Sequence, residues 1–219
     1  MNLPCQTSFP FDTAEYCIGF CNGTAMPNPG AMGIGGYITF IDGRRHEFSE
    51  VAGIGTSNEA EYLALIRMLN LAIENGMKNF TLHMDSQLVV DQCTGTWGVK
   101  STALAKLKGK VTELKEAFDA LNIVWVPRRD NRAATTLSEM ALIRAASESG
   151  RIAASQGVQV VEISPDIFVA YGASGNKYVV DLDHHVCSCP DFQNRGRTAG
   201  PCKHLAAAIL KRGEMKGKE

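Results

Sequence analysis

The stretch IGFCNGTAMPNPG, residues 18–30, decides the fold of this chain. It begins with an apolar segment typical of a buried strand, and it continues with an Asn-Gly pair and an Asn-Pro-Gly triplet, which are typical of tight turns. We therefore expect a strand over residues 15–21 that runs straight into a glycine-containing loop. The turn residues fix the backbone where the strand ends, so the side chain of Asn22 is held at that point.

The composition predicts a globular chain without a strong overall charge. Of the 219 residues, 45% are hydrophobic, and the formal net charge is −1. Such a charge predicts no strong nonspecific attraction to nucleic acid, so any binding of this kind must come from local patches. No apolar run is long enough for a membrane span, and the N-terminus has no basic-then-apolar signal. We expect a cytoplasmic protein whose seven cysteines are reduced, as core residues or metal ligands.

The first 150 residues predict an α/β domain with a mixed five-stranded sheet flanked by helices. Helix caps such as Thr56 or Ser57 and apolar residues spaced by three and four mark the helices. The expected order is strands 15–21, 35–41 and 44–51, a helix 56–76, a strand 79–84, helices 86–93 and 101–121, a strand 123–126 and a helix 135–147. Hairpin strands followed by alternating helices and strands favour one sheet with helices packed on it.

After about residue 150 the pattern changes to a small-residue linker and short strands over residues 158–163, 167–171 and 177–182. We divide the chain into an N-terminal extension 1–14, a larger domain 15–150, a linker 151–157 and a C-terminal domain 158–219. The C-terminal domain is too short for a sufficient core of its own and needs a further stabilising element.

A metal site provides that element. Cys187 and Cys189 alternate on one expected strand face, and Cys202 and His204 follow at an expected helix start. Three thiolates and one imidazole form a closed tetrahedral set, which is typical of structural zinc. The pattern resembles the SWIM zinc finger, and the resemblance implies a small zinc-stapled ββα-type domain. We expect chelation to unfold this domain while the larger domain survives.

Several separated motifs of the larger domain resemble type 1 ribonuclease H and occur in the order of that family. They are the first strand with its turn, the TSNEAE segment 56–61, the DSQ segment 85–87, and the VWVPR segment 124–128 followed by Asn131. The resemblance implies a ribonuclease H-like fold, RNA/DNA hybrid as the partner, and two Mg²⁺ ions held by four carboxylates. It places Glu61 and Asp85 at two of those four positions.

The other two carboxylate positions of the family are not acidic in this chain. Asn22 stands where the aspartate that bridges both ions is expected, and Thr135 stands where the fourth carboxylate is expected. Two-metal hydrolysis needs a cluster of hard, anionic oxygens. With only Glu61 and Asp85 left, we expect at most one weakly held Mg²⁺ or Mn²⁺ ion.

Three other acids stand near these positions in the sequence. Glu59 is two residues from Glu61 and points elsewhere on the helix. Glu139 lies one turn beyond Thr135, displaced by about 6 Å along the helix axis. Asp130, in the preceding loop, is the best placed of the three as a replacement ligand.

The resemblance also implies a set of residues that line the minor groove of a hybrid. Neutral donors and acceptors of this kind can recognise 2′-hydroxyl groups, which distinguish RNA from DNA. Each also has a structural alternative, as a turn, a helix cap, a loop anchor or a solvated helix face. The candidates, with a tryptophan and a lysine added, are Gly23, Thr24, Asn28, Thr56, Asn58, Gln87, Trp97 and Lys100.

We favour a nucleic-acid-binding protein with a catalytically impaired ribonuclease H-like fold, a pseudoenzyme, that prefers RNA/DNA hybrid or another RNA-containing duplex. Two alternatives stay open: an active or weak metal-dependent hybrid endoribonuclease, and an adaptor whose zinc finger binds protein. Basic residues near the zinc site form the expected second surface: Arg195, Arg197, Lys203, Lys211 and Arg212. His184 and His185 are expected to be surface residues.

Overall fold

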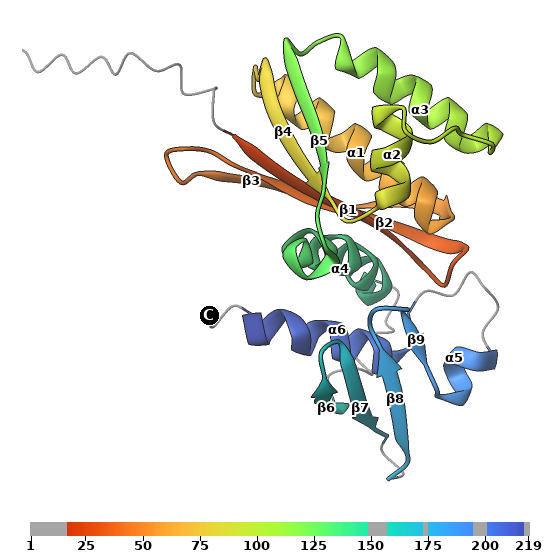
Figure 1. Cartoon of the computed structure of the whole chain (residues 1–219). Helices are drawn as coiled ribbons and strands as arrows, with labels where there is room; N and C mark the ends of the chain where they lie inside the picture. The colour runs from red at the N-terminus through yellow and green to blue at the C-terminus, as the bar shows by residue number, and fades with distance from the viewer. Residues whose placement is uncertain (1–16, 149–156, 173–174, 195–200, 217–219) are drawn as a thin grey trace, which may run out of the picture.

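The structure is a computed structural model that describes residues 17–148, 157–172, 175–194 and 201–216. The expected extension 1–14 and residues 151–156 of the expected linker lie outside the described residues. Figure 1 shows a larger sheet with helices on both faces and, beyond α4, a smaller sheet with the long helix α6. Within the described ranges no helix is both long and apolar enough to cross a membrane.

The larger sheet has five strands in the order β3-β2-β1-β4-β5. Its strands are β1 (Ile18–Met26), β2 (Gly30–Thr39), β3 (Arg45–Gly55), β4 (Asn79–Met84) and β5 (Ala120–Trp125). The first three strands pair antiparallel, whereas β4 pairs parallel with β1 and with β5. This is the mixed sheet that the sequence predicts.

Helices cover both faces of this sheet (Figure 1). One face carries α1 (Ser57–Glu74), α2 (Gln87–Thr94) and α3 (Thr102–Lys115), and the other carries α4 (Arg132–Glu148), which follows the short 3₁₀ helix η1 (Arg128–Asp130). Thr56 caps α1 in a complete capping box with Glu59, as the cap residues predict. The apolar face of α1, including Tyr62, Leu65 and Leu69, is fully buried in the core.

Several elements differ from the predicted boundaries, among them β1 and α3, because strand pairing overrides local signals. β1 continues past Cys21 to Met26, because residues 22–26 pair with residues 31–35 of β2, so Asn22 lies inside the strand and not at its end. α3 ends at Lys115 and does not reach residue 121, because residues 120–125 pair with β4. Phe118 and Leu121 still pack on the core, so apolar residues continue at the spacing of a helix beyond the end of α3.

The C-terminal domain has a four-stranded antiparallel sheet in sequence order. Its elements are β6 (Gln159–Ser164), β7 (Ile167–Tyr171), β8 (Lys177–Asp181), β9 (Val186–Cys187), α5 (Pro190–Asn194) and α6 (Lys203–Lys216). Phe168 and Val180 of the sheet and Leu205 and Ile209 of α6 are fully buried and form its core.

The larger domain contributes side chains to the hydrophobic core of the C-terminal domain. Met26 of β1 and Leu142 and Ile143 of α4 belong to the same buried cluster as Phe168 and Leu205. α4 and α6 lie side by side where the domains meet. The C-terminal domain therefore buries apolar side chains of the larger domain in addition to its own.

Candidate functional site

Four residues stand at the family's carboxylate positions: Asn22, Glu61, Asp85 and Thr135. The structure brings the side chains of the first three together, and we call these three residues the centre. Asn22 lies in the middle of β1, Glu61 lies near the start of α1, and Asp85 directly follows β4. Asn22 and Glu61 are buried, and Asp85 is partly exposed. The parallel pairing of β1 with β4 places Asn22 and Asp85 beside each other, as the resemblance implies.

The side-chain amide of Asn22 occupies the space between the two carboxylates. Its Nδ2 donates to Glu61 Oε1 at 3.3 Å and to Asp85 Oδ1 at 3.0 Å. Its Oδ1 accepts a hydrogen bond of 2.7 Å from Ser138 Oγ of α4. Both amide hydrogens and the amide oxygen are thus used, which fixes the orientation of the group.

Further N–H donors hold the same carboxylates. The backbone N–H of Gly23 donates to Glu61 Oε2 at 3.0 Å, and Asn131 Nδ2 donates to Asp85 Oδ1. Burial, with the nearby Asp85 charge, raises the pKa of Glu61 well above its usual range, and the Gly23 hydrogen bond opposes this rise. The negative charge of this centre is therefore balanced mainly by neutral amide donors.

Thr135 is buried but directs its hydroxyl elsewhere. Its Oγ1 donates to the backbone carbonyl of Asn131 at 3.1 Å, within the first turn of α4. The centre thus offers two carboxylates and several amide nitrogens, and amide N–H groups repel cations. This donor set does not fit two divalent ions, which require a cluster of anionic oxygens.

None of the three alternative acids completes the centre. Glu59 accepts the backbone N–H of Thr56 at 2.7 Å and is committed to the helix cap. Asp130 is exposed and lies 3.8 Å from Arg129. Glu139 is completely buried, where Arg212 of α6 and His185 contact it.

Glu139 belongs to a buried ionic cluster between the domains. Arg212 donates to Glu139 Oε2 and, at 3.0 Å, to Asp166 Oδ1. The other oxygen of Asp166 accepts from Arg132 at 3.3 Å. His185 Nε2 lies 2.8 Å from Glu139 Oε1, and the side chain of His185 is only 13% exposed. The expectation that His185 is a surface residue is therefore wrong, because its turn docks against α4, whereas His184 is exposed.

Replacing Arg212 with methionine is expected to lower the free energy of unfolding by about 3 kcal/mol, because Glu139 is then left buried without its charged partner. The double variant Arg212→Met/Glu139→Met should recover most of this loss, since no unpaired charge remains. Chemical denaturation of the full chain measures both effects, with the exposed neighbour Lys211→Met as the control. An Arg212→Met effect no larger than that of the control would contradict the expectation.

The predicted groove residues fall into two groups. Gly23 and Thr24 are buried, so neither lines an open groove in this structure. A Cβ atom at Gly23 would lie 2.1 Å from the carbonyl carbon of Ala60, and Thr24 Oγ1 lies 3.4 Å from Nδ1 of His185. The remaining candidates are exposed or partly exposed: Asn28, Thr56, Asn58, Gln87, Trp97 and Lys100.

The four candidate zinc ligands converge on one point. The ligand atoms of Cys187, Cys189, Cys202 and His204 all lie within 4.8 Å of one another, and all four residues are buried. Among the described residues, neither ring nitrogen of His204 has a hydrogen-bond partner. A buried imidazole in this situation fits a metal ligand, because a coordinate bond satisfies one of its nitrogens.

The three thiols of this cluster differ in pKa. A hydrogen bond from the Cys187 thiol lowers the pKa of Cys202 to about 6, whereas the same hydrogen bond and burial raise the pKa of Cys187, and burial raises the pKa of Cys189. Burial lowers the pKa of His204, which favours the neutral imidazole. Thiolate and neutral imidazole are the forms that bind zinc.

Sequence reasoning missed several residues that shape these sites. Ser138 fixes the amide of Asn22, and His185 and Arg212 bind Glu139. No local pattern marks these residues, because their partners lie far away in the sequence. The sequence marks Asn131 only as part of a family motif. In the structure Asn131 directly precedes α4, and its side-chain amide donates to Asp85 at the centre.

Two family comparisons match different parts of the chain. Residues 21–141 match the reverse transcriptase-like family, and residues 178–213 match the SWIM zinc finger. The first match contains Asn22, Glu61 and Asp85, and the second contains all four candidate zinc ligands. Both resemblances that the sequence predicts are thereby confirmed at the level of family and fold.

Individual proteins are similar to the larger domain. Ribonuclease HI of Halobacterium salinarum is 36% identical over 124 residues, which are 56% of this chain and 62% of that protein. The putative hydrolase EbsB of Enterococcus faecalis is 32% identical over 117 residues, which are 52% of this chain and 85% of that protein. The match spans less than two thirds of the halobacterial relative and 36% of the similar mycobacterial proteins.

Solved structures are similar over the same region. RNase H1 from Halobacterium salinarum has a TM-score of 0.56 at 35% identity, covering 57% of this chain and 96% of that one. LC11-RNase H1 in complex with an RNA/DNA hybrid has a TM-score of 0.56 at 34% identity, covering 59% of this chain and 99% of that one.

Proposed function

The chain belongs to the reverse transcriptase-like family, matched over residues 21–141, and from this premise we propose that it binds nucleic acid without cutting it efficiently. In this proposal the ribonuclease H-like domain carries the principal binding surface. The C-terminal SWIM zinc finger is a structural unit that adds a second surface.

The hydrogen bonds of the Asn22 amide carry the proposal of impaired catalysis. One nitrogen donates to both Glu61 and Asp85, so it lies where a cation would have to bind these carboxylates. A bound Mg²⁺ would need the amide to turn its oxygen inward, which breaks both hydrogen bonds from Nδ2 to the carboxylates and the hydrogen bond from Ser138 Oγ to the amide oxygen. When metal ions are bound in a two-metal centre, one activates water and the other stabilises the leaving oxygen. This chain has too few anionic ligands for that chemistry.

Binding is supported by the relatives and by the exposed polar residues. The structure of LC11-RNase H1 holds an RNA/DNA hybrid, and that protein is 34% identical over the larger domain. Asn58 and Gln87, which the resemblance assigns to the minor groove, are exposed at the starts of α1 and α2. Neutral residues at positions 22 and 135 also repel phosphate less than carboxylates do. We infer a preference for RNA-containing duplexes through 2′-hydroxyl groups.

We infer further that Cys187, Cys189, Cys202 and His204 hold one zinc ion that stabilises the C-terminal domain. Of the proposed second surface, Lys203 and Lys211 belong to α6. Arg212 does not contribute to an exposed surface, because it is buried against Glu139 and Asp166. The remaining two residues, Arg195 and Arg197, lie outside the described residues.

We expect the full chain, with zinc bound, to bind a labelled RNA/DNA hybrid in buffer without added Mg²⁺ or Mn²⁺, and to leave the hybrid uncut when either ion is added. Fluorescence anisotropy with hybrid and DNA duplexes of one sequence measures the preference, and denaturing gels measure cleavage. The double variant Asn58→Ala/Gln87→Ala should reduce the preference for the hybrid, because two groups that contact the minor groove are removed. Asn122→Ala, which removes an exposed amide from β5, is the matched control.

Each outcome distinguishes the candidate functions. Robust cleavage that is lost on Asp85→Asn would establish the alternative, a metal-dependent ribonuclease H, which the named activity of the halobacterial relative supports. Negligible affinity for hybrid, RNA and DNA at low salt would refute nucleic-acid binding and leave a protein-binding adaptor.

A further inference from the structure

A cavity of about 290 Å³ lies between the two domains at the start of α4. Four arginines and two aspartates line it: Arg128, Arg129, Arg132, Arg212, Asp166 and Asp183. Thr135 also lines the cavity. Ser138 Oγ lies within hydrogen-bond distance of both the Thr135 carbonyl and Asn22 Oδ1, so the cavity is near the centre formed by Asn22, Glu61 and Asp85. The two domains contribute to it jointly, because Arg128, Arg129 and Arg132 come from η1 and α4 and the other charged residues come from the C-terminal domain.

The residues that line the cavity carry more positive than negative charge, and each of its four arginines also pairs with a carboxylate. Its lining carries two more guanidinium groups than carboxylates. Both oxygens of Asp166 are occupied by Arg132 and Arg212, and Arg128 Nε lies 3.5 Å from Asp183. Glu139 and Asp130 lie nearby, the first buried behind Arg212 and the second exposed beside Arg129. Each guanidinium has five N–H donors, so these contacts do not exhaust them.

Two further features favour negative charge at this place. Arg212 is 4% exposed, and among the described residues its Nε–H group is buried without a hydrogen-bond partner, so Glu139 and Asp166 do not satisfy the whole guanidinium group. The cavity also lies at the N-terminus of α4, a helix of 17 residues whose dipole places partial positive charge there. Asn131, which directly precedes α4, uses its side-chain amide for Cys21 and Asp85 and not for capping.

We propose that this interdomain cavity binds a phosphate group of the nucleic-acid backbone. The proposal rests on the proposed function and deepens it, because it names the contact that holds the strand beside the degenerate centre. Two oxygens of a phosphate can accept both N–H groups of one planar guanidinium fork, and two or three arginines can share the phosphate oxygens. The arginines of both domains then bind one strand together, so the zinc finger domain forms part of the nucleic-acid site.

Two substitutions that should change the affinity for the hybrid in opposite directions test the proposal in the full chain. Arg129→Gln removes an exposed cation from the cavity, and we expect hybrid affinity in 0.1 M salt to fall about fivefold. The slope of log affinity against log salt should become shallower by about one. Asp183→Asn removes a carboxylate, and we expect affinity to rise about twofold. Arg128→Lys keeps the charge but loses the bidentate fork and should give a loss smaller than Arg129→Gln.

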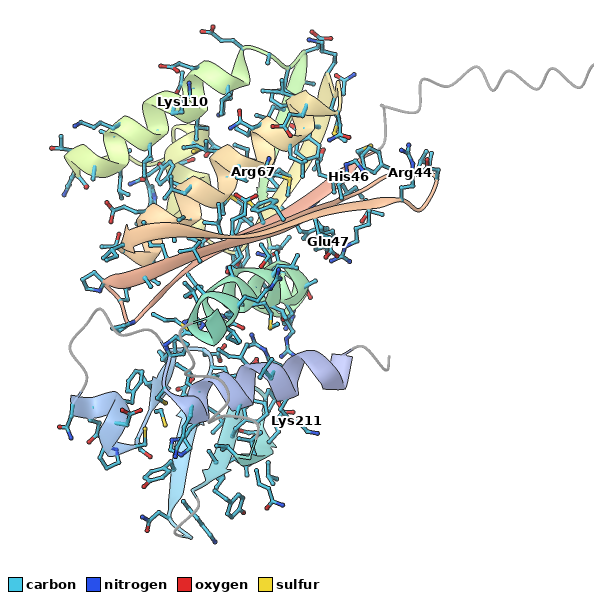
Figure 2. All side chains as sticks on the ribbon, turned by 180° about the vertical axis from the view of Figure 1, so that it is seen from behind. Arg44, His46, Glu47, Arg67, Lys110 and Lys211 are labelled. Atoms are coloured by element: carbon cyan, nitrogen blue, oxygen red, sulfur yellow. The ribbon has the colours of Figure 1, made fainter. Side chains whose placement is uncertain are left out.

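The matched control is Arg44→Gln. Arg44 is exposed at the tip of the hairpin formed by β2 and β3, away from α6, as Figure 2 shows. Its removal changes the net charge by the same amount without touching the cavity. Thermal unfolding of every variant checks that the fold is unchanged.

The outcomes separate this site from the proposed function. If the unaltered chain binds hybrid, and Arg129→Gln and Asp183→Asn both behave like Arg44→Gln, the phosphate site is refuted and nucleic-acid binding stands. If the unaltered chain binds no nucleic acid, both proposals fail. A further arm adds inorganic phosphate at constant ionic strength. Thermal stabilisation by inorganic phosphate that Arg129→Gln abolishes, with unchanged hybrid affinity, would assign the cavity to free phosphate and overturn the nucleic-acid contact.

Discussion

Removal of zinc is expected to destabilise the whole chain and not only the C-terminal domain. A structural zinc site of this kind contributes most of the folding free energy of a small domain, so chelation should unfold it. The structure changes the expectation for the rest of the chain, because Met26, Leu142 and Ile143 of the larger domain are buried in the shared core. Exposing these three side chains should cost the larger domain about 5 kcal/mol.

The measurement is thermal unfolding of the full chain with zinc bound and after chelation, followed by circular dichroism and by calorimetry. Cys202→Ser should reproduce the effect of chelation, because it removes one ligand. Cys93→Ser is the control, since Cys93 is buried in the larger domain away from the cluster. If chelation unfolds residues 158–219 while the larger domain keeps its midpoint, the shared core does not couple the domains. Elemental analysis that finds no zinc in protein purified without chelator would refute the zinc site itself.

The double variant Asn22→Asp/Thr135→Asp is expected to gain Mg²⁺-dependent cleavage of RNA/DNA hybrid. It restores carboxylates at both degenerate positions, so four anionic side chains can surround two ions. The amide that donates to Glu61 and Asp85 is removed at the same time. Without Mg²⁺ or Mn²⁺, however, the carboxylate introduced at position 22 and those of Glu61 and Asp85 repel one another. Asn22→Asp alone should therefore lower the free energy of unfolding by about 3 kcal/mol in buffer without Mg²⁺ or Mn²⁺ and with zinc still bound, because two N–H donors are lost beside buried charge.

The change of stability on adding divalent ions tests whether the restored carboxylates form a metal site. Mg²⁺ or Mn²⁺ should raise the unfolding midpoint of the Asn22→Asp/Thr135→Asp variant, because ions bind only the folded cluster, and should leave the unaltered chain nearly unchanged. Adding Asp85→Asn to the double variant should abolish both the stabilisation and the cleavage. A folded double variant that neither gains stability with Mg²⁺ nor cuts the hybrid would show that the missing carboxylates are not what limits this centre.

The sequence alone determined the features that depend on local patterns. The capping box at Thr56 and the placement of Glu61 follow from one short segment, and the place of Asp85 follows from the end of an apolar strand. The candidate zinc ligands follow from the sequence in the same way, because two pairs of metal-binding residues at a spacing of two form a signal that needs no knowledge of the fold. These patterns are local because caps, strand alternation and ligand pairs involve residues only a few positions apart.

Only the tertiary structure decided the rest. The end of β1 and the end of α3 depend on strand partners far away in the sequence, which outweigh turn and helix signals. The contact of His185 with Glu139 spans 46 residues, and that of Ser138 with Asn22 spans 116 residues. The arginine-lined cavity exists only because α6 docks against α4. Such contacts leave no periodic trace in the sequence, because each of them depends on bringing together segments that lie far apart along the chain.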